Sequence, residues 1–124
     1  MNPRQPISDR RIRFALLGCG RIAHIHIASL AQHADRAQLV AVCDIDQARA
    51  DESAARWGVP AFYRLADLLQ GADVDLISVC TGGFENGSAH FEPVMECFGA
   101  GKHVLCEKPI SNNIEHAREM NRTA

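Results

Sequence analysis

The segment Glu107-Lys108-Pro109 places an acid, a base and an imino acid directly after the apolar run "HVLC" at His103–Cys106. Such a run predicts a buried strand, and a buried strand does not ordinarily end in two opposite charges. In a parallel sheet, the loops after the carboxyl ends of the strands face the ligand crevice. There Lys108 could donate a proton to a substrate hydroxyl or polarise a carbonyl. Pro109 fixes the backbone, and a cis bond before it would turn the lysine inward.

A second stretch with chemical potential is the glycine turn "GCGRIA" at positions 18–23, which fits the pattern GxGxxG/A. It stands between an apolar run and a helical pattern, the context that a dinucleotide-binding turn requires. Gly18 would permit the tight turn, Gly20 would let a pyrophosphate approach the backbone, and Ala23 would let the helix pack closely. The N–H groups of Arg21 and Ile22 would then point at the phosphates, assisted by the helix dipole.

The second apolar run ends in "CDID", and its first acid, Asp44, stands 21 residues after Ala23. An acid at about this distance, at the tip of the second strand, accepts the adenosine ribose hydroxyls of a dinucleotide. Its charge would repel a 2′-phosphate, so NAD is favoured over NADP. The alternative is that Asp44 only caps the next helix, a role for which Asp46 is better placed. Ile45 would lie against the adenine.

Apolar runs and helical patterns alternate along the chain. The strong runs are apolar throughout, as in a parallel sheet covered by helices on both faces. Right-handed crossovers then predict an α/β fold, a doubly wound parallel sheet of the Rossmann type. The expected strands are 13–17, 38–43, 61–63, 75–80 and 103–106; the expected helices follow the glycine turn, span 47–57 and 65–70, include 91–98, and begin at a cap on Asn112.

Composition limits the class of protein. The chain has 124 residues, of which 47% are hydrophobic and 23% charged, and a net charge of −2. One compact domain is expected, with no nucleic acid or membrane partner and no transmembrane helix. The polar stretch 1–11 predicts a flexible tail before a domain at 12–124. Five cysteines without CxxC indicate reduced thiols in a cytoplasmic protein, and His24 and His26, two apart on a helix, predict no metal site.

Together, "GCGRIA", "VCDID" and above all "AGKHVLCEKPIS" resemble the NAD(P)-binding Rossmann domain of the Gfo/Idh/MocA oxidoreductases over residues 12–124. The resemblance implies NAD(P)-dependent oxidation of a secondary hydroxyl on a sugar, inositol or related polyol. It implies that Lys108 contacts the nicotinamide ribose and the substrate and takes part in catalysis. By the same resemblance, Glu107 lies near the nicotinamide end. His90 matches a family histidine that would touch the substrate, although packing at a helix start explains it equally well.

One loop departs from the family pattern. Where the family usually shows T-P-N after the fourth strand, this chain reads "TGGFENGSAH", with Gly82 at the proline position. Thr81 is still expected to line the nicotinamide pocket. The longer loop puts the family's contacts from Phe84 to Ser88 in question and suggests a subgroup with its own substrate.

The resemblance also implies a second α/β domain, which carries most substrate contacts and the interface of a homo-oligomer. The 124 residues leave no room for it, so we expect a Rossmann sheet that is incomplete at the C-terminus and inactive alone. The alternative is a stand-alone, non-catalytic dinucleotide-binding or regulatory module. The coding sequence after Ala124 distinguishes the two, since an open frame for an α/β domain means a fragment and a stop means a module.

Overall fold

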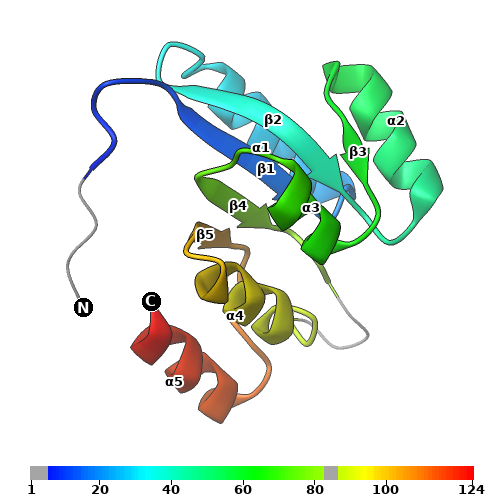
Figure 1. The fold of residues 1–124 in the computed structure, drawn as a ribbon. Helices are drawn as coiled ribbons and strands as arrows, with labels where there is room; N and C mark the ends of the chain where they lie inside the picture. Colours follow the sequence, from blue (N-terminus) through cyan, green and yellow to red (C-terminus); the bar gives the residue numbers. More distant parts are fainter. Residues whose placement is uncertain (1–5, 83–86) are drawn as a thin grey trace.

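A computed structural model describes residues 6–82 and 87–124, which build one five-stranded parallel sheet in the order β3-β2-β1-β4-β5 (Figure 1). From β1 the chain winds outward through β2 to β3, then crosses back and continues through β4 to β5. This order confirms the predicted doubly wound Rossmann sheet. The strands are β1 (Ile12–Leu17), β2 (Ala37–Cys43), β3 (Ala61–Phe62), β4 (Leu76–Val79) and β5 (His103–Cys106).

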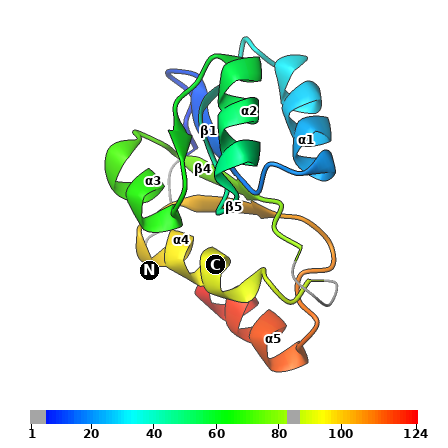
Figure 2. The ribbon, with the colours of Figure 1, turned by 90° about the vertical axis from the view of Figure 1, so that its right-hand side faces the viewer.

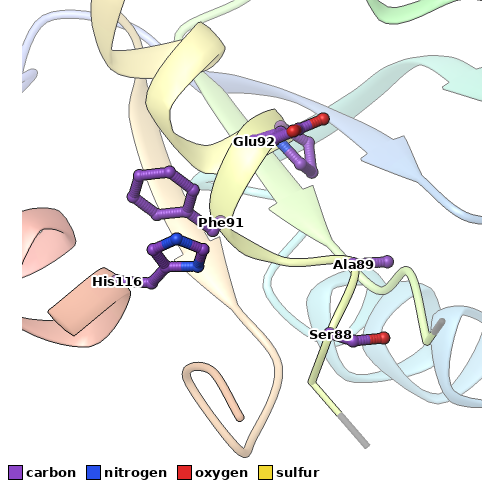
Figure 3. Close-up of a pocket in the computed structure, with 6 residues that line it drawn as sticks. Ser88, Ala89, Phe91, Glu92 and His116 are labelled. Carbon is purple, nitrogen blue, oxygen red and sulfur yellow. The ribbon is translucent and has the colours of Figure 1, made fainter. Parts of the chain in front are cut away.

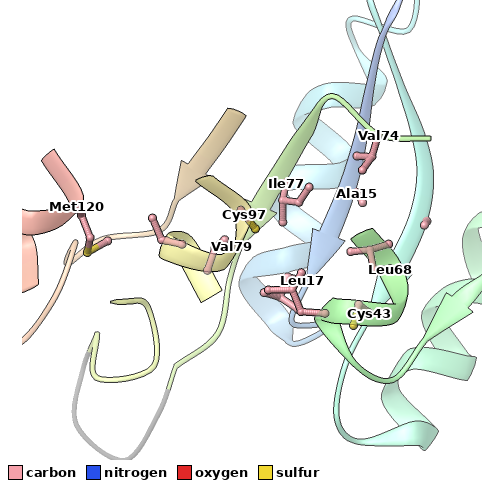
Figure 4. Packing of buried hydrophobic residues seen from close by; sticks show 12 residues of the cluster. Ala15, Leu17, Cys43, Leu68, Val74, Ile77, Val79, Cys97 and Met120 are labelled. Atoms are coloured by element: carbon pink, nitrogen blue, oxygen red, sulfur yellow. The ribbon is translucent and has the colours of Figure 1, made fainter. Parts of the chain in front are cut away.

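Helices cover both faces of the sheet, with α1 and α2 on one side and α3, α4 and α5 on the other (Figure 2). Because successive strand residues point to opposite faces, the core has two halves. In β1, Leu16 packs toward α1 and α2, whereas Ala15 and Leu17 join the cluster on the other face (Figure 4). The helices are α1 (Arg21–Ala31), α2 (Gln47–Trp57), α3 (Leu65–Gly71), α4 (Phe91–Gly99) and α5 (Ile114–Thr123).

Local capping signals set the ends of the helices. Asp46 caps α2 as predicted, since its side chain accepts the Arg49 N–H, and Gly58 ends that helix in the left-handed conformation at φ 68°. The predicted cap of α5 was one residue too early. Asn113, not Asn112, has the extended backbone of a cap, and its side-chain oxygen accepts the N–H groups of Glu115 and His116. A cap must reach the second and third N–H groups of its helix, which only the adjacent residue does here.

The predicted burial of "HVLC" was wrong for one face of the strand. His103 and Leu105 of β5 are exposed, while Val104 and Cys106 are half-buried against the cluster around α4. Within the described residues β5 pairs with β4 and with no strand on its other side. It is therefore an edge strand, and only its face against α4 is shielded from water.

A charge cluster surrounds Asp75, which precedes β4 at the amino-terminal ends of the parallel strands. Arg10 donates two hydrogen bonds to its carboxylate at 2.7 and 2.8 Å, and the Arg13 N–H donates a third at 2.8 Å. Arg10 belongs to the stretch expected to be a tail, so this part of it is tied to the sheet. The hydrogen bonds from Arg10 and Arg13 hold the pKa of Asp75 well below its usual range.

Replacing Asp75 with asparagine should lower the free energy of unfolding by about 2 kcal/mol near neutral pH, because charged hydrogen bonds are lost. A lowered pKa stabilises the fold above the unfolded value of about 3.9 and ceases to do so as the pH falls through the folded value. The difference between the wild type and Asp75→Asn should therefore shrink in strong acid. Urea titrations at several pH values measure this.

Asp73 supplies the matched control, because it also pairs with Arg13 but its side chain is 80% exposed, against 11% for Asp75. Asp73→Asn should change the free energy of unfolding by less than about 0.5 kcal/mol. Equal effects of the two substitutions would contradict the structural role of Asp75.

The sequence predicts neither a transmembrane helix nor a metal site, and it predicts reduced cysteines. Within the described residues, no helix is long and apolar enough to cross a membrane, and no cluster of His, Cys, Asp and Glu could hold a metal ion. The five cysteines carry free thiols. Burial raises the pKa of the Cys43 and Cys97 thiols to about 12, so neither is an activated nucleophile.

Candidate dinucleotide site

The predicted site residues meet at the carboxyl edge of the sheet. β1 and β4 lie side by side, and the chain continues from them toward opposite edge strands of the sheet. In open α/β sheets, ligands bind at the carboxyl ends of the strands at such a point. Gly18 follows β1, Asp44 follows β2, Thr81 comes shortly after β4, and Glu107 follows β5. All four therefore belong to one edge, as the strand ends in Figure 1 show.

Gly18 is required by both conformation and space. Its φ is +88°, and a Cβ there would stand 2.9 Å from the carbonyl carbon of Cys80 and 3.1 Å from the Thr81 nitrogen. Its N–H donates to the Cys43 carbonyl at 2.8 Å. The turn is thus packed between the end of β2 and the backbone that leaves β4, and only glycine fits there.

Gly20 is required for a different reason. It has an extended backbone at the N-cap of α1, and a Cβ there would meet no atom within 4 Å. No side chain caps α1 and its first turn holds no acid, while Arg21 and Ile22 lie exposed. The open space therefore adjoins N–H groups that a phosphate could accept from, so the turn fits the pyrophosphate of a dinucleotide.

Asp44 connects the glycine turn to the tip of β2. Only 7% of the residue is exposed; one carboxylate oxygen accepts the Cys19 N–H and the other accepts the Asp46 N–H, both at 2.9 Å. These bonds use two of about four acceptor positions and leave two for ribose hydroxyls. Since Asp46 caps α2, Asp44 has no capping role there. Ile45 beside it is 91% exposed, an apolar surface that a flat base could cover.

At the other end of the edge, Glu107 joins a chain of hydrogen bonds that reaches into the sheet. Its Oε2 lies 2.6 Å from Nε2 of His26 on α1, and Nδ1 of the same ring lies 2.8 Å from Oγ of Ser78 in β4. The hydrogen bond from His26 lowers the pKa of the Glu107 carboxyl, and the backbone N–H and charge of Lys108 act in the same direction. The acid is therefore a carboxylate at neutral pH.

The Glu-Lys-Pro turn packs against the segment that precedes α4. The Lys108–Pro109 bond is cis and Lys108 is exposed. A Cβ on Gly87 would come within 2.9 Å of the Pro109 ring, and Nδ1–H of His90 donates to the Pro109 carbonyl at 2.7 Å. His90 is 2% exposed, and through this hydrogen bond to Pro109 its buried ring supports the turn from behind.

Thr81 stands at the start of the loop that departs from the family pattern. Its hydroxyl donates to the carbonyl of Ala89 at 2.8 Å and so joins the beginning of the loop to its end. Residues 83–86 lie outside the described part of the chain, and with them most of the predicted change from Phe84 to Ser88.

Sequence reasoning missed His26, the partner of Glu107, and Ser78, the partner of the other His26 ring nitrogen. His26 was considered only as half of a metal pair with His24, which instead lies 3.4 Å from the Trp57 indole nitrogen. The available signal was Ser78, a hydroxyl in the middle of the apolar run of β4. A buried polar group requires a partner, so this serine indicated a polar side chain above it.

A separate small cavity of about 230 Å³ lies where α4 and α5 begin (Figure 3). The rings of Phe91 and His116 stack beside it, with centroids 4.0 Å apart. The volume is below the usual range of ligand sites, and its lining includes no residue of the glycine turn or the Glu-Lys-Pro turn. We therefore place the candidate site at the carboxyl edge of the sheet.

The fold and this edge together define a dinucleotide-binding domain of the Rossmann class. Residues 12–124 match the sequence model of the Gfo/Idh/MocA oxidoreductases, described as an oxidoreductase family with an NAD-binding Rossmann fold. The chain belongs to this family and contains its NAD(P)-binding domain.

Individual relatives agree with this assignment. Inositol 2-dehydrogenase 3 of Saccharopolyspora erythraea is 36% identical over 104 residues, which are 84% of this chain and 30% of that protein. D-glucoside 3-dehydrogenase of Escherichia coli is 33% identical over 91% of this chain and 31% of its own length. The solved WlbA dehydrogenase of Chromobacterium violaceum, in complex with NADH and UDP-GlcNAcA, superposes with a TM-score of 0.92 at 42% identity, covering 100% of this chain and 35% of that one. The chain thus spans about a third of these proteins.

Proposed function

We propose that this chain is the NAD-binding part of a dehydrogenase that oxidises a secondary hydroxyl of a sugar, inositol or related polyol. The observation that carries the proposal is the placement of the glycine turn, Asp44 and the Glu-Lys-Pro turn along one edge of the sheet. The names of the inositol and glucoside dehydrogenases that it resembles support the substrate class.

Each part of the edge has a role in this proposal. The N–H groups of Gly20, Arg21 and Ile22 bind the pyrophosphate, and Gly18 shapes the turn that presents them. The carboxylate of Asp44 accepts the adenosine ribose hydroxyls, with Ile45 against the adenine.

The nicotinamide end belongs to the loops after β4 and β5. Thr81 lines the nicotinamide pocket, and Glu107 lies at its side. A bound nicotinamide supplies a hydride acceptor. Lys108 contacts the nicotinamide ribose and the substrate, and its Nζ orients the reacting hydroxyl and exchanges a proton with it.

His90 is the weakest of these assignments. A direct substrate contact would require the Pro109 carbonyl to release it, since the ring is buried and already donates to that oxygen. Its support behind the turn is a sufficient reason for a histidine at this position.

A nucleotide-linked sugar is a second candidate substrate within the same class. The WlbA dehydrogenase was solved with UDP-GlcNAcA, and it is 42% identical over the whole of this chain, against 36% for the inositol dehydrogenase over 84%. In either case we place the intact enzyme in the cytoplasm as a homo-oligomer. A stand-alone binding module remains the alternative from another functional class, and the coding sequence beyond Ala124 separates the two.

Calorimetric titration of the chain with NAD and NADP tests the cofactor assignment. We expect NAD to bind at least about tenfold more tightly, because the Asp44 carboxylate accepts ribose hydroxyls and repels a 2′-phosphate. Asp44→Asn should weaken NAD binding about tenfold, through loss of a charged hydrogen bond, and remove most of the preference. The control is Asp46→Asn, since that acid caps α2 and belongs to no proposed contact. Absence of binding to both dinucleotides would refute the proposed function.

A further inference from the structure

Ser78, His26 and Glu107 form a continuous hydrogen-bonded chain from the middle of the sheet to the Glu-Lys-Pro turn. Ser78 is 0% exposed, so its hydroxyl depends on a protein partner, and the His26 ring supplies it at 2.8 Å. The other ring nitrogen meets the Glu107 carboxylate at 2.6 Å. These hydrogen bonds join α1, β4 and the residue after β5, which are far apart in the sequence.

The chemistry of the groups sets the direction of these bonds. A carboxylate only accepts, so Nε2–H of His26 donates to Glu107. In the neutral ring Nδ1 then accepts from the Ser78 hydroxyl, and the Cys80 thiol lies 3.5 Å from the same nitrogen. The Glu107 carboxylate thereby selects the tautomer that carries its proton on Nε2, and the Ser78 hydroxyl, which can donate or accept, complements it at Nδ1.

Both the backbone and the side chain of Glu107 are therefore held. Its N–H donates to the Val79 carbonyl at 3.0 Å, which continues the sheet, and its carboxylate is held by His26. Lys108 follows directly and is exposed, and its backbone N–H and its charge act on the Glu107 carboxylate. The direction in which Lys108 projects therefore depends on how the Glu107 carboxylate is held.

We propose that His26 is a positioning residue, which holds the Glu107 carboxylate through Nε2–H and so orients the Glu-Lys-Pro turn toward the nicotinamide end of a bound dinucleotide. The inference rests on the proposed function, in which this turn meets the nicotinamide ribose. The proposal predicts an effect at the nicotinamide end of the cofactor alone, because the adenosine end depends on Gly20 and Asp44, which His26 does not touch.

The variants His26→Asn and His26→Gln provide a matched test. The asparagine amide reaches about as far as Nδ1 and can bond Ser78 but not Glu107, whereas the glutamine amide reaches the position of Nε2 and can donate to the carboxylate. Titration with NAD and with ADP, which lacks both the nicotinamide and its ribose, measures the two ends separately. We expect His26→Asn to weaken NAD binding about tenfold and ADP binding less than about twofold, and His26→Gln to restore most of the NAD affinity.

Equal weakening of both ligands, or unchanged NAD affinity in His26→Asn, would overturn the proposal, since a merely structural histidine affects both ends alike. Amide spectra of the ligand-free variants give a readout that does not depend on binding. The Glu107 and Lys108 amide signals should move in His26→Asn and stay near their wild-type positions in His26→Gln. If the wild-type chain binds neither ligand, the proposed function fails, while unmoved amide signals in His26→Asn refute the positioning role by themselves.

Discussion

Replacing Gly18 with alanine should lower the free energy of unfolding by about 3 kcal/mol or more, a large part of the stability of a small domain. Two penalties add. A positive φ of +88° costs a residue with a Cβ about 1–2 kcal/mol. The new methyl group would also lie 2.9 Å from the Cys80 carbonyl carbon, which is backbone in the sheet edge and cannot rotate away, so overpacking adds about 1–3 kcal/mol.

Urea denaturation followed by circular dichroism measures the Gly18 effect, with Gly99→Ala as the matched control. Gly99 ends α4 without a positive φ, and a Cβ there meets nothing within 4 Å. This control should be neutral or slightly stabilising, because alanine favours a helix more than glycine does. A Gly18→Ala protein as stable as the control would show that the glycine turn is not packed against β4 as the structure has it.

Replacing Gly20 with alanine should have the opposite profile, with stability retained and NAD binding weakened about 100-fold. A Cβ at Gly20 meets no protein atom, so the fold accepts it. The same methyl group occupies the space through which the pyrophosphate approaches the first N–H groups of α1. Loss of two charge-assisted hydrogen bonds at about 1.5 kcal/mol each corresponds to a factor of about 100.

Calorimetric titration with NAD measures the Gly20 effect, and the denaturation curve of the same protein shows whether the fold is intact. Gly99→Ala again serves as the control and should bind NAD as the wild type does. Undiminished NAD binding by Gly20→Ala would place the pyrophosphate elsewhere and would remove the main support for the proposed function.

Most of the secondary structure follows from local signals in the sequence. The helix α2 begins and ends where Asp46 and Gly58 predict, and β5 has the predicted bounds, because caps, left-handed glycines and apolar runs act within a few residues. The unbroken apolar character of the strands also predicted a parallel sheet with helices on both faces. The glycine turn and the Glu-Lys-Pro segment identified the family, since both are short and depend on residue type alone.

Only the tertiary structure decided the contacts that join distant segments. His26 and Glu107 are 81 positions apart, and no local pattern brings a histidine of α1 to the end of β5. Likewise, the Asp44 carboxylate reaches across to the Cys19 N–H, and Arg10 in the expected tail pairs with Asp75.

The exposure of one face of β5 also depends on the fold, because a strand loses contact with water only when a neighbour covers it. The sequence alone thus predicted which residues could carry chemistry and which elements hold them, because residue type and spacing are local properties. The fold decided how they are paired, because hydrogen bonds across a sheet edge depend on which strands become neighbours.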